Sequence, residues 1–418
     1  MKDKLHKHSF SVLFAYLWSL SGLVILLLIA YYKFPFFENS QLLGHTIPLL
    51  AGASVVYLIL SLLLSSLRSH PASTNQLVVN FVCTAFGLLL FMALAAAREY
   101  FSLGYLTVYI LFTNIWFSIE FFIRRKFGRY YFAVAPGGYD LFSETFPNCS
   151  LIPMSEPNEL PKGIDGLIVD FEQPLSESWL SFVSRCILQG VPVISVDDFV
   201  ETEKGVIILE HLNTSRTLTF QKNQFYVFVK QLLDQLLVLI TLPLWGLLAM
   251  VTGACIRLES PGPVIFSQIR MGKKGKPFRI YKFRSMRYDS EANGAAFAQK
   301  GDSRITRVGA VIRKFRIDEI PQFWNVLRGD MSIIGPRPEQ IPFVEQFEQN
   351  IPYYQLRHIV RPGITGWAQV TRGYAANETQ TAEKLAADLY YVKQLSFSLD
   401  FLILIKTIWT ILTGFGSR

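Results

Sequence analysis

Residues 235–256 read QLLVLITLPLWGLLAMVTGACI and contain no charged side chain. A run of this length is long enough to cross the hydrocarbon core of a membrane as a helix. Pro243 lies inside the run. A proline within a helix removes a backbone hydrogen bond and bends the helix, so the sequence predicts a helix that is broken at Pro243.

The flanks of this run indicate that it does not cross the membrane. Residues 257–287 carry nine basic side chains and one acidic one, Glu259. Such a basic flank belongs in the cytoplasm, where the region before the run is also expected. We therefore predict a re-entrant helix over about residues 228–256 that enters the membrane and turns back. A fifth span, with the remainder of the chain outside the cell, is the alternative.

Four further uncharged stretches lie near the N-terminus, and each is long enough to cross a membrane. Lysines precede the first stretch, and residues 124–129 after the fourth are rich in arginine and lysine. Basic flanks stay inside, so we predict a four-helix membrane domain over residues 1–128 with both ends in the cytoplasm. The stretches are residues 9–32, 46–67, 71–97 and 100–119.

The composition agrees with a membrane protein. Of the 418 residues, 51% are hydrophobic and only 17% are charged, which excludes a disordered chain and argues against a wholly soluble enzyme. The net charge of +8 favours a phosphorylated substrate or anionic lipid as the binding partner, rather than nucleic acid. The four cysteines form no metal-binding spacing, and we expect them to be free thiols.

The pattern of residues 129–222 predicts a Rossmann-like cytoplasmic α/β domain. Apolar runs at 166–171 and 191–196 resemble buried strands, and the spacing of residues 176–188 between them is helical. This strand–helix–strand order favours a parallel sheet. A shorter strand at 131–135 ends in Pro136-Gly137-Gly138. The segment is not the G-x-G-x-x-G fingerprint, so we interpret it as a plain turn.

The remaining residues, 223–418, are predicted to form an α-rich domain that carries the chemistry. Residues 316–339 read RIDEIPQFWNVLRGDMSIIGPRPE and place Asp318 beside Glu319 among several arginines. Neighbouring side chains on a helix point in different directions, so the two carboxylates can serve two roles at one site. Arginine is suited to binding phosphate oxygens. A plain salt-bridge network at a helix start is the alternative. Residues 397–412 predict an interfacial helix.

Further unusual segments accompany this block: YKFRSM at 281–286, RITRVG at 304–309 and RPGITGWAQV at 361–370. Together they closely resemble the bacterial sugar transferase family, the polyprenyl-phosphate sugar-1-phosphate transferases that begin glycan assembly on a lipid carrier. The resemblance covers about residues 226–418. The four spans and the middle α/β domain resemble the large members of the family, with a monotopic catalytic domain.

The resemblance implies a reaction and its partners. A UDP-sugar gives its sugar-1-phosphate to undecaprenyl phosphate, which yields UMP and undecaprenyl diphosphate-hexose. This is the first membrane step of exopolysaccharide, capsule or O-antigen assembly. The implied cofactor is Mg²⁺, bound at Asp318 and the diphosphate. A homodimer is possible.

The resemblance also implies roles for single residues. Asp318 matches the nucleophile that forms a covalent aspartyl phospho-sugar, and Glu319 matches its acid–base partner. Arg313 and Arg337 match phosphate-binding positions. Three more basic side chains, Lys282, Arg284 and Arg361, are candidates for binding phosphate, with a structural salt bridge as the alternative for each. The family commonly has a Ser-Pro helix break, where this chain has Leu242-Pro243.

The sugar is open between galactose, glucose and an N-acetylated hexosamine, and the resemblance to large members favours an unacetylated hexose. Two other functions stay open. One is a membrane glycosyltransferase that transfers only sugar, although this chain lacks the Asp-x-Asp that often holds the metal in that class. The other is a catalytically inactive membrane scaffold or regulator of the same fold.

Overall fold

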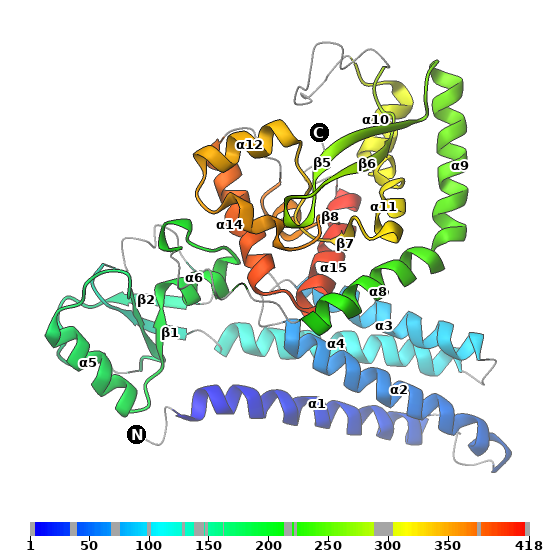
Figure 1. Cartoon of the computed structure of the whole chain (residues 1–418). Helices are drawn as coiled ribbons and strands as arrows, with labels where there is room; N and C mark the ends of the chain where they lie inside the picture. Colours follow the sequence, from blue (N-terminus) through cyan, green and yellow to red (C-terminus); the bar gives the residue numbers. More distant parts are fainter. Residues whose placement is uncertain are drawn as a thin grey trace. The chain divides into compact units, whose positions relative to one another are not determined.

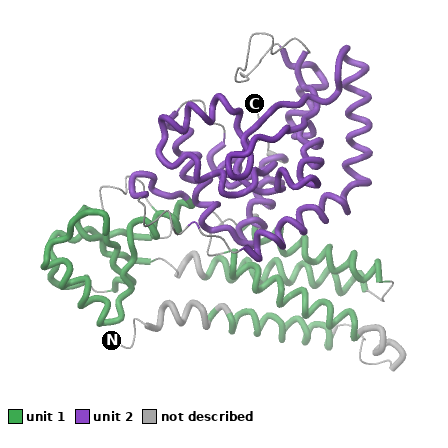
Figure 2. The backbone as a smooth tube through the Cα atoms, in the orientation of Figure 1, with its two compact units in different colours: residues 1–205 green, residues 206–418 purple. Residues whose placement is uncertain are grey.

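The chain divides into two compact units, residues 1–205 and residues 206–418 (Figure 2). The structure is a computed structural model. It describes residues 5–33, 40–67, 76–97, 102–127, 130–137, 146, 149–161, 163–212, 220, 224–287, 304–373 and 378–413.

The first unit begins with four long apolar helices, which confirms that part of the sequence prediction. Windows within three of them are long and apolar enough to cross a membrane, and the first contains the shorter apolar stretch Tyr16–Tyr32. One polar contact between these helices is the hydrogen bond that Ser118 of the fourth donates to Asn80 of the third at 2.9 Å. The helices are α1 (Leu5–Lys33), α2 (Ser40–Leu67), α3 (Gln76–Ala96) and α4 (Leu103–Phe127).

A four-stranded parallel sheet completes this unit, with the strand order β2-β1-β3-β4. Three of its strands and the helix α5 lie where the sequence predicts them, whereas β2 was not foreseen. The buried side chains of α5, among them Trp179 and Phe182, pack with Leu167 of β3. The elements are β1 (Tyr130–Val134), β2 (Cys149–Pro153), β3 (Gly166–Val169), α5 (Glu177–Leu188), β4 (Val193–Ser195) and α6 (Val196–Lys204).

The second unit is mainly helical, with two small sheets (Figure 1). One sheet is the antiparallel hairpin β5–β6, and the other pairs β7 with β8 in parallel. In chain order the elements are α8 (Gln224–Ile240), α9 (Leu242–Glu259), β5 (Ile265–Met271), β6 (Pro277–Phe283), α10 (Arg307–Lys314), α11 (Gln322–Arg328), β7 (Ser332–Ile334), α12 (Ile341–Asn350), β8 (Gly363–Thr365), α13 (Trp367–Thr371), α14 (Glu378–Lys393) and α15 (Phe397–Thr413).

The helix break lies at the predicted place. Helix α8 ends at Ile240 and α9 begins at Leu242, so that Pro243 occupies the first turn of α9, and the two helices meet in an open bend (Figure 1). The Thr241 hydroxyl donates to the Leu237 carbonyl at 2.7 Å, and the Trp245 indole donates to the Val238 carbonyl at 2.9 Å. Thr241 and Trp245 therefore supply the polar partners that Leu242 lacks.

Both halves of the broken helix expose large apolar side chains. Leu236 and Leu239 of α8 are more than half exposed, as are Leu244 and Met250 of α9. An apolar surface of this extent marks a site of contact with a membrane or a protein. It supports the predicted re-entrant placement, which stays a prediction.

The opposite, polar side of α8 is anchored inside the unit. Lys230 pairs with Asp400 of α15 at 2.7 Å, and Tyr226 donates to the same carboxylate at 2.6 Å. One turn further on, the carboxylate of Asp234 accepts from the backbone N–H of Ile333 at the β7 strand. These bonds fix the start of the broken helix to α15 and β7.

Candidate active site

The two adjacent carboxylates lie on a tight turn between two helices. Helix α10 ends at Lys314, and Arg316 then adopts a left-handed backbone conformation with φ of 55°. The single 3-10 turn Ile317–Glu319 follows and leads through Pro321 into α11. Left-handed backbone is costly for a residue with a Cβ and recurs at functional sites. Here it ends α10 and turns Asp318 and Glu319 inward.

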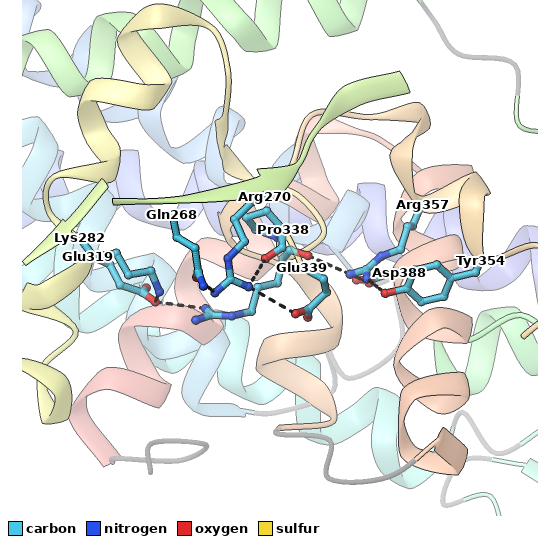
Figure 3. Close-up of polar contacts among 10 residues, drawn as sticks. Gln268, Arg270, Lys282, Glu319, Pro338, Glu339, Tyr354, Arg357 and Asp388 are labelled. Carbon is cyan, nitrogen blue, oxygen red and sulfur yellow. Dashed lines mark hydrogen bonds and ion pairs between the residues drawn. The ribbon is translucent and has the colours of Figure 1, made fainter. Parts of the chain in front are cut away.

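Glu319 is buried, with 6% of its surface exposed, and three cations surround it. Its Oε1 atom lies 3.1 Å from Nη1 of Arg337 and 3.7 Å from Nζ of Lys282. Its Oε2 atom lies 3.7 Å from Nη1 of Arg316. Lys282 and Glu319 lie side by side in Figure 3. Burial alone would raise the pKa of Glu319, but the three cations outweigh burial and lower it. Glu319 is therefore an ionised carboxylate at neutral pH.

Asp318 faces a cavity of about 640 Å³. Burial and the adjacent charge of Glu319 raise the pKa of Asp318 above its usual value, while Lys282, Arg337 and Arg313 oppose that rise. The two neighbouring carboxyl groups thus have pKa values displaced in opposite directions. Such divergent pairs are common at catalytic sites.

The cavity is strongly basic. Eight lysine and arginine side chains and three carboxylates are among the residues that line it. The balance favours an anionic ligand with several charges. The basic residues are Arg270, Lys282, Arg284, Arg287, Arg313, Arg337, Arg357 and Lys384, and the acidic ones are Asp318, Glu339 and Asp388.

Most of the residues predicted for the site are brought together here. Lys282 comes from β6, Arg313 from α10 and Arg337 from the loop between β7 and α12, and all three line the cavity with Asp318. Sequence reasoning missed Arg270, Arg287, Arg357 and Lys384. These four carry no local signal, because isolated basic residues in a sequence resemble any surface charge.

Two predicted phosphate ligands have other partners. Arg284 lines the cavity, but its guanidinium donates to the carbonyls of Ser260 and Pro261, each at 2.8 Å. It thereby holds the segment that follows α9. Arg361 is not among the residues that line this cavity, and its Nε donates to the Gly329 carbonyl at 2.9 Å.

The glycines of two motifs are explained by close packing of backbones. A Cβ on Gly335 would lie 2.4 Å from the carbonyl oxygen of Arg361, and a Cβ on Gly363 would lie 2.1 Å from the nitrogen of Gly335. Only glycine permits this approach. The buried Asn325, in the segment Trp324-Asn325-Val326, joins α11 to β6. Its side chain donates to the Arg279 carbonyl and accepts from the Tyr281 N–H. These motif residues build the frame of the site.

Comparison with known proteins identifies the family of this chain. Residues 225–414 match the family described as bacterial sugar transferase. A protein of Aeromonas hydrophila, named UDP-N-acetylgalactosamine-undecaprenyl-phosphate N-acetylgalactosaminephosphotransferase, is 43% identical over 377 residues, which cover 88% of each chain. The chain belongs to the bacterial sugar transferase family. The family match includes every residue that lines the cavity.

Other relatives match a smaller share of the chain. A UDP-glucose:undecaprenyl-phosphate glucose-1-phosphate transferase of Caulobacter vibrioides is 40% identical over 186 residues, which cover 44% of this chain and 70% of that protein. A protein of the same name from Escherichia coli is 46% identical over 158 residues, 37% of this chain and 34% of that protein. The relatives' names thus include both an N-acetylated and an unacetylated sugar.

Proposed function

We propose that this protein transfers sugar-1-phosphate from a UDP-sugar to undecaprenyl phosphate at the bacterial inner membrane, and releases UMP. The names of the relatives support the two substrates. The observation that carries the proposal is the placement of Asp318, which faces a basic cavity beside a carboxylate that is already neutralised by three cations.

The proposed reaction has two displacements at one phosphorus atom. A carboxylate oxygen of Asp318 attacks the β-phosphorus of the UDP-sugar, and the bond from that phosphorus to the bridging oxygen breaks. UMP leaves with the electron pair, and an aspartyl phospho-sugar remains. A phosphate oxygen of the lipid then attacks the same phosphorus. The bond to Asp318 breaks, its carboxylate is restored, and undecaprenyl diphosphate-sugar is formed.

The basic residues stabilise the charge that these steps spread over the phosphate oxygens, which is the main task in phosphoryl transfer. Arg337, Arg313 and Lys282 are the nearest candidates, because their charges act on Asp318. Glu319 holds two of these cations, Arg337 and Lys282. With its pKa lowered by them, Glu319 is better suited to fixing their positions than to the acid–base role that the resemblance implies.

The residues present fit Mg²⁺ in one way. Among the described residues, no cluster of three possible metal ligands occurs. Mg²⁺ commonly binds one or two carboxylates together with substrate phosphates. Of the adjacent pair, Asp318 is the carboxylate available for this, since Glu319 is occupied by its three cations. When bound, the ion offsets repulsion between the nucleophile and the diphosphate.

The broken helix explains how a soluble donor can reach an acceptor that lies in the membrane. In the proposal, the exposed apolar surface of α8 and α9 lies in the leaflet and the cavity of the same unit opens to the cytoplasm. The hydrogen bonds of Thr241 and Trp245 at the break satisfy carbonyl groups that lipid would otherwise leave without partners.

The donor sugar to test first is N-acetylgalactosamine. It is named for the relative whose match covers 88% of this chain, whereas the matches to the two relatives named for glucose cover 44% and 37% of it. An unacetylated hexose, which the sequence favoured, is the second candidate.

UMP release tests this function. Protein in nanodiscs with Mg²⁺ and undecaprenyl phosphate is given a panel of UDP-sugars, and Asp318→Asn is measured beside the wild type. We expect release with one sugar and none above background from the variant, which should keep the melting temperature of the wild type. Full activity in Asp318→Asn would remove Asp318 as the nucleophile. No release from wild type with any UDP-sugar would contradict the proposed function.

A further inference from the structure

Three consecutive backbone carbonyl groups around Arg337 accept hydrogen bonds. The carbonyl of Pro336 accepts from the Gly363 N–H at 2.9 Å, and the carbonyl of Pro338 accepts from the Arg270 guanidinium at 3.3 Å. Between them, the carbonyl of Arg337 itself accepts from Nη2 of Arg357 at 3.0 Å. Prolines on both sides of Arg337 further restrict its backbone. The loop between β7 and α12 is thus fixed on both sides of the arginine.

Arg357 is itself held from two directions. The same Nη2 atom donates to Oδ2 of Asp388 on α14 at 2.8 Å, and Nη1 donates to the hydroxyl of Tyr354. The Arg357 and Asp388 side chains are only 7% and 4% exposed. Figure 3 shows Arg357 beside Tyr354 and Asp388. Although Arg357 lines the cavity, its Nη1 and Nη2 atoms both donate to groups of the protein.

This geometry separates Arg357 from the arginines expected to bind phosphate. A guanidinium has five N–H donors in a rigid fork. The Nη2 atom of Arg357 bridges the Asp388 carboxylate and the Arg337 carbonyl and so joins α14 to the loop between β7 and α12, while Nη1 bonds to Tyr354. Arg337 then reaches Glu319 with its own Nη1 atom at 3.1 Å. A chain of three contacts therefore connects α14 to the carboxylate pair.

We propose that Arg357, anchored by Asp388, is a positioning residue that holds the backbone of Arg337 so that the Arg337 guanidinium meets both Glu319 and the diphosphate of the donor. The inference rests on the proposed function, since the diphosphate is that of the UDP-sugar. Arg357 contributes through Arg337 and does not touch the reacting atoms. Lysine in its place keeps the charge but has one nitrogen instead of the Nη1 and Nη2 pair, so it cannot hold Tyr354, Asp388 and the Arg337 carbonyl in the same geometry.

The test is a double-mutant cycle on donor binding. The dissociation constant of the UDP-sugar is measured by calorimetry on nanodisc-held Asp318→Asn protein, in which the donor is not consumed. We expect Arg357→Lys to weaken binding about tenfold, the size of effect seen when a partner that orients a ligand-binding group is lost. Combined with Arg337→Ala, the same substitution should change the dissociation constant less than about twofold, because the side chain it positions is gone.

Asp388→Asn is a second route if Arg357→Lys fails to fold. It keeps an acceptor but removes the charge that anchors Arg357, and should weaken donor binding in the same direction, again only when Arg337 is present. Arg257→Lys is the matched control. Arg257 also donates to a backbone carbonyl, that of Gly262 at 2.9 Å, but it does not line the cavity. It should leave the dissociation constant within about twofold.

The outcomes are distinct. Equal losses from Arg357→Lys with and without Arg337 would show that Arg357 acts on the fold in general, and would overturn the inference. Unchanged binding in folded Arg357→Lys would overturn it as well. If the parent Asp318→Asn protein and the wild type both fail to bind any UDP-sugar, the proposed function is what fails.

Discussion

Replacing Glu319 by glutamine removes the charge that three cations share. Glutamine keeps the size of the side chain and can still accept a hydrogen bond from Arg337. Removal of one partner from a buried ion pair costs about 3–5 kcal/mol. The Lys282 and Arg337 side chains remain 19% and 34% exposed, so water screens part of their repulsion. We therefore expect a loss near the lower end, about 3 kcal/mol.

In the unit that holds the site, a loss of this size corresponds to a fall of about 6–12 °C in melting temperature. It is measured by intrinsic fluorescence of the nanodisc-held protein. UMP release should fall too, because Arg337 and Lys282 lose the anion that holds them. The control is Glu378→Gln, an exposed carboxylate that accepts from Asn350 at 2.7 Å, with an expected change within about 0.5 kcal/mol. If Glu319→Gln has the same melting temperature as Glu378→Gln and the wild type, Glu319 does not hold these cations.

Two further predictions concern pH and topology. Burial, and then the charge of Arg357, lower the pKa of His358 to about 3. Below pH 6.5 the unfolded chain therefore takes up a proton that the folded chain does not. The free energy of unfolding falls as the pH drops from 6.5, by about 1 kcal/mol at pH 5.5. His358→Gln should remove that part of the pH dependence of the melting temperature, and an identical dependence in the two proteins would refute the assignment. Leu188→Cys in the first unit and Glu345→Cys in the second, both exposed and placed in a cysteine-free background, should both resist an impermeant maleimide in spheroplasts and both react in inverted vesicles. Labelling of Leu188→Cys and Glu345→Cys from opposite sides would mean that residues 235–256 span the membrane.

The features that sequence predicted well are those with a local physical signature. Uncharged runs located the four apolar helices of the first unit, and a single proline located the break between α8 and α9. The motif alone does not predict the hydrogen bonds that satisfy the carbonyl groups at the break. Their donors, Thr241 and Trp245, lie on either side of the Leu242-Pro243 pair and outside the family motif.

The motifs predicted the residues that line the cavity around Asp318. They did not predict which basic residues bond to backbone carbonyl groups instead. Lys282, Arg313 and Arg337 line the cavity beside Asp318, as the motifs implied. Arg284 bonds instead to carbonyls that follow α9, and an arginine that holds a carbonyl looks in sequence like one that holds a phosphate. The pairing of Arg357 with Asp388 joins residues 31 positions apart, so only the folded chain reveals it.

The most direct test of the account omits the lipid acceptor. Wild-type protein in nanodiscs is mixed with Mg²⁺ and its UDP-sugar, and UMP is followed by rapid quench. A covalent intermediate on Asp318 predicts a burst that approaches one UMP per protein and then stops, and no burst from Asp318→Asn. UMP release that requires undecaprenyl phosphate from the first turnover would contradict the account, because the sugar phosphate would then pass directly from donor to lipid.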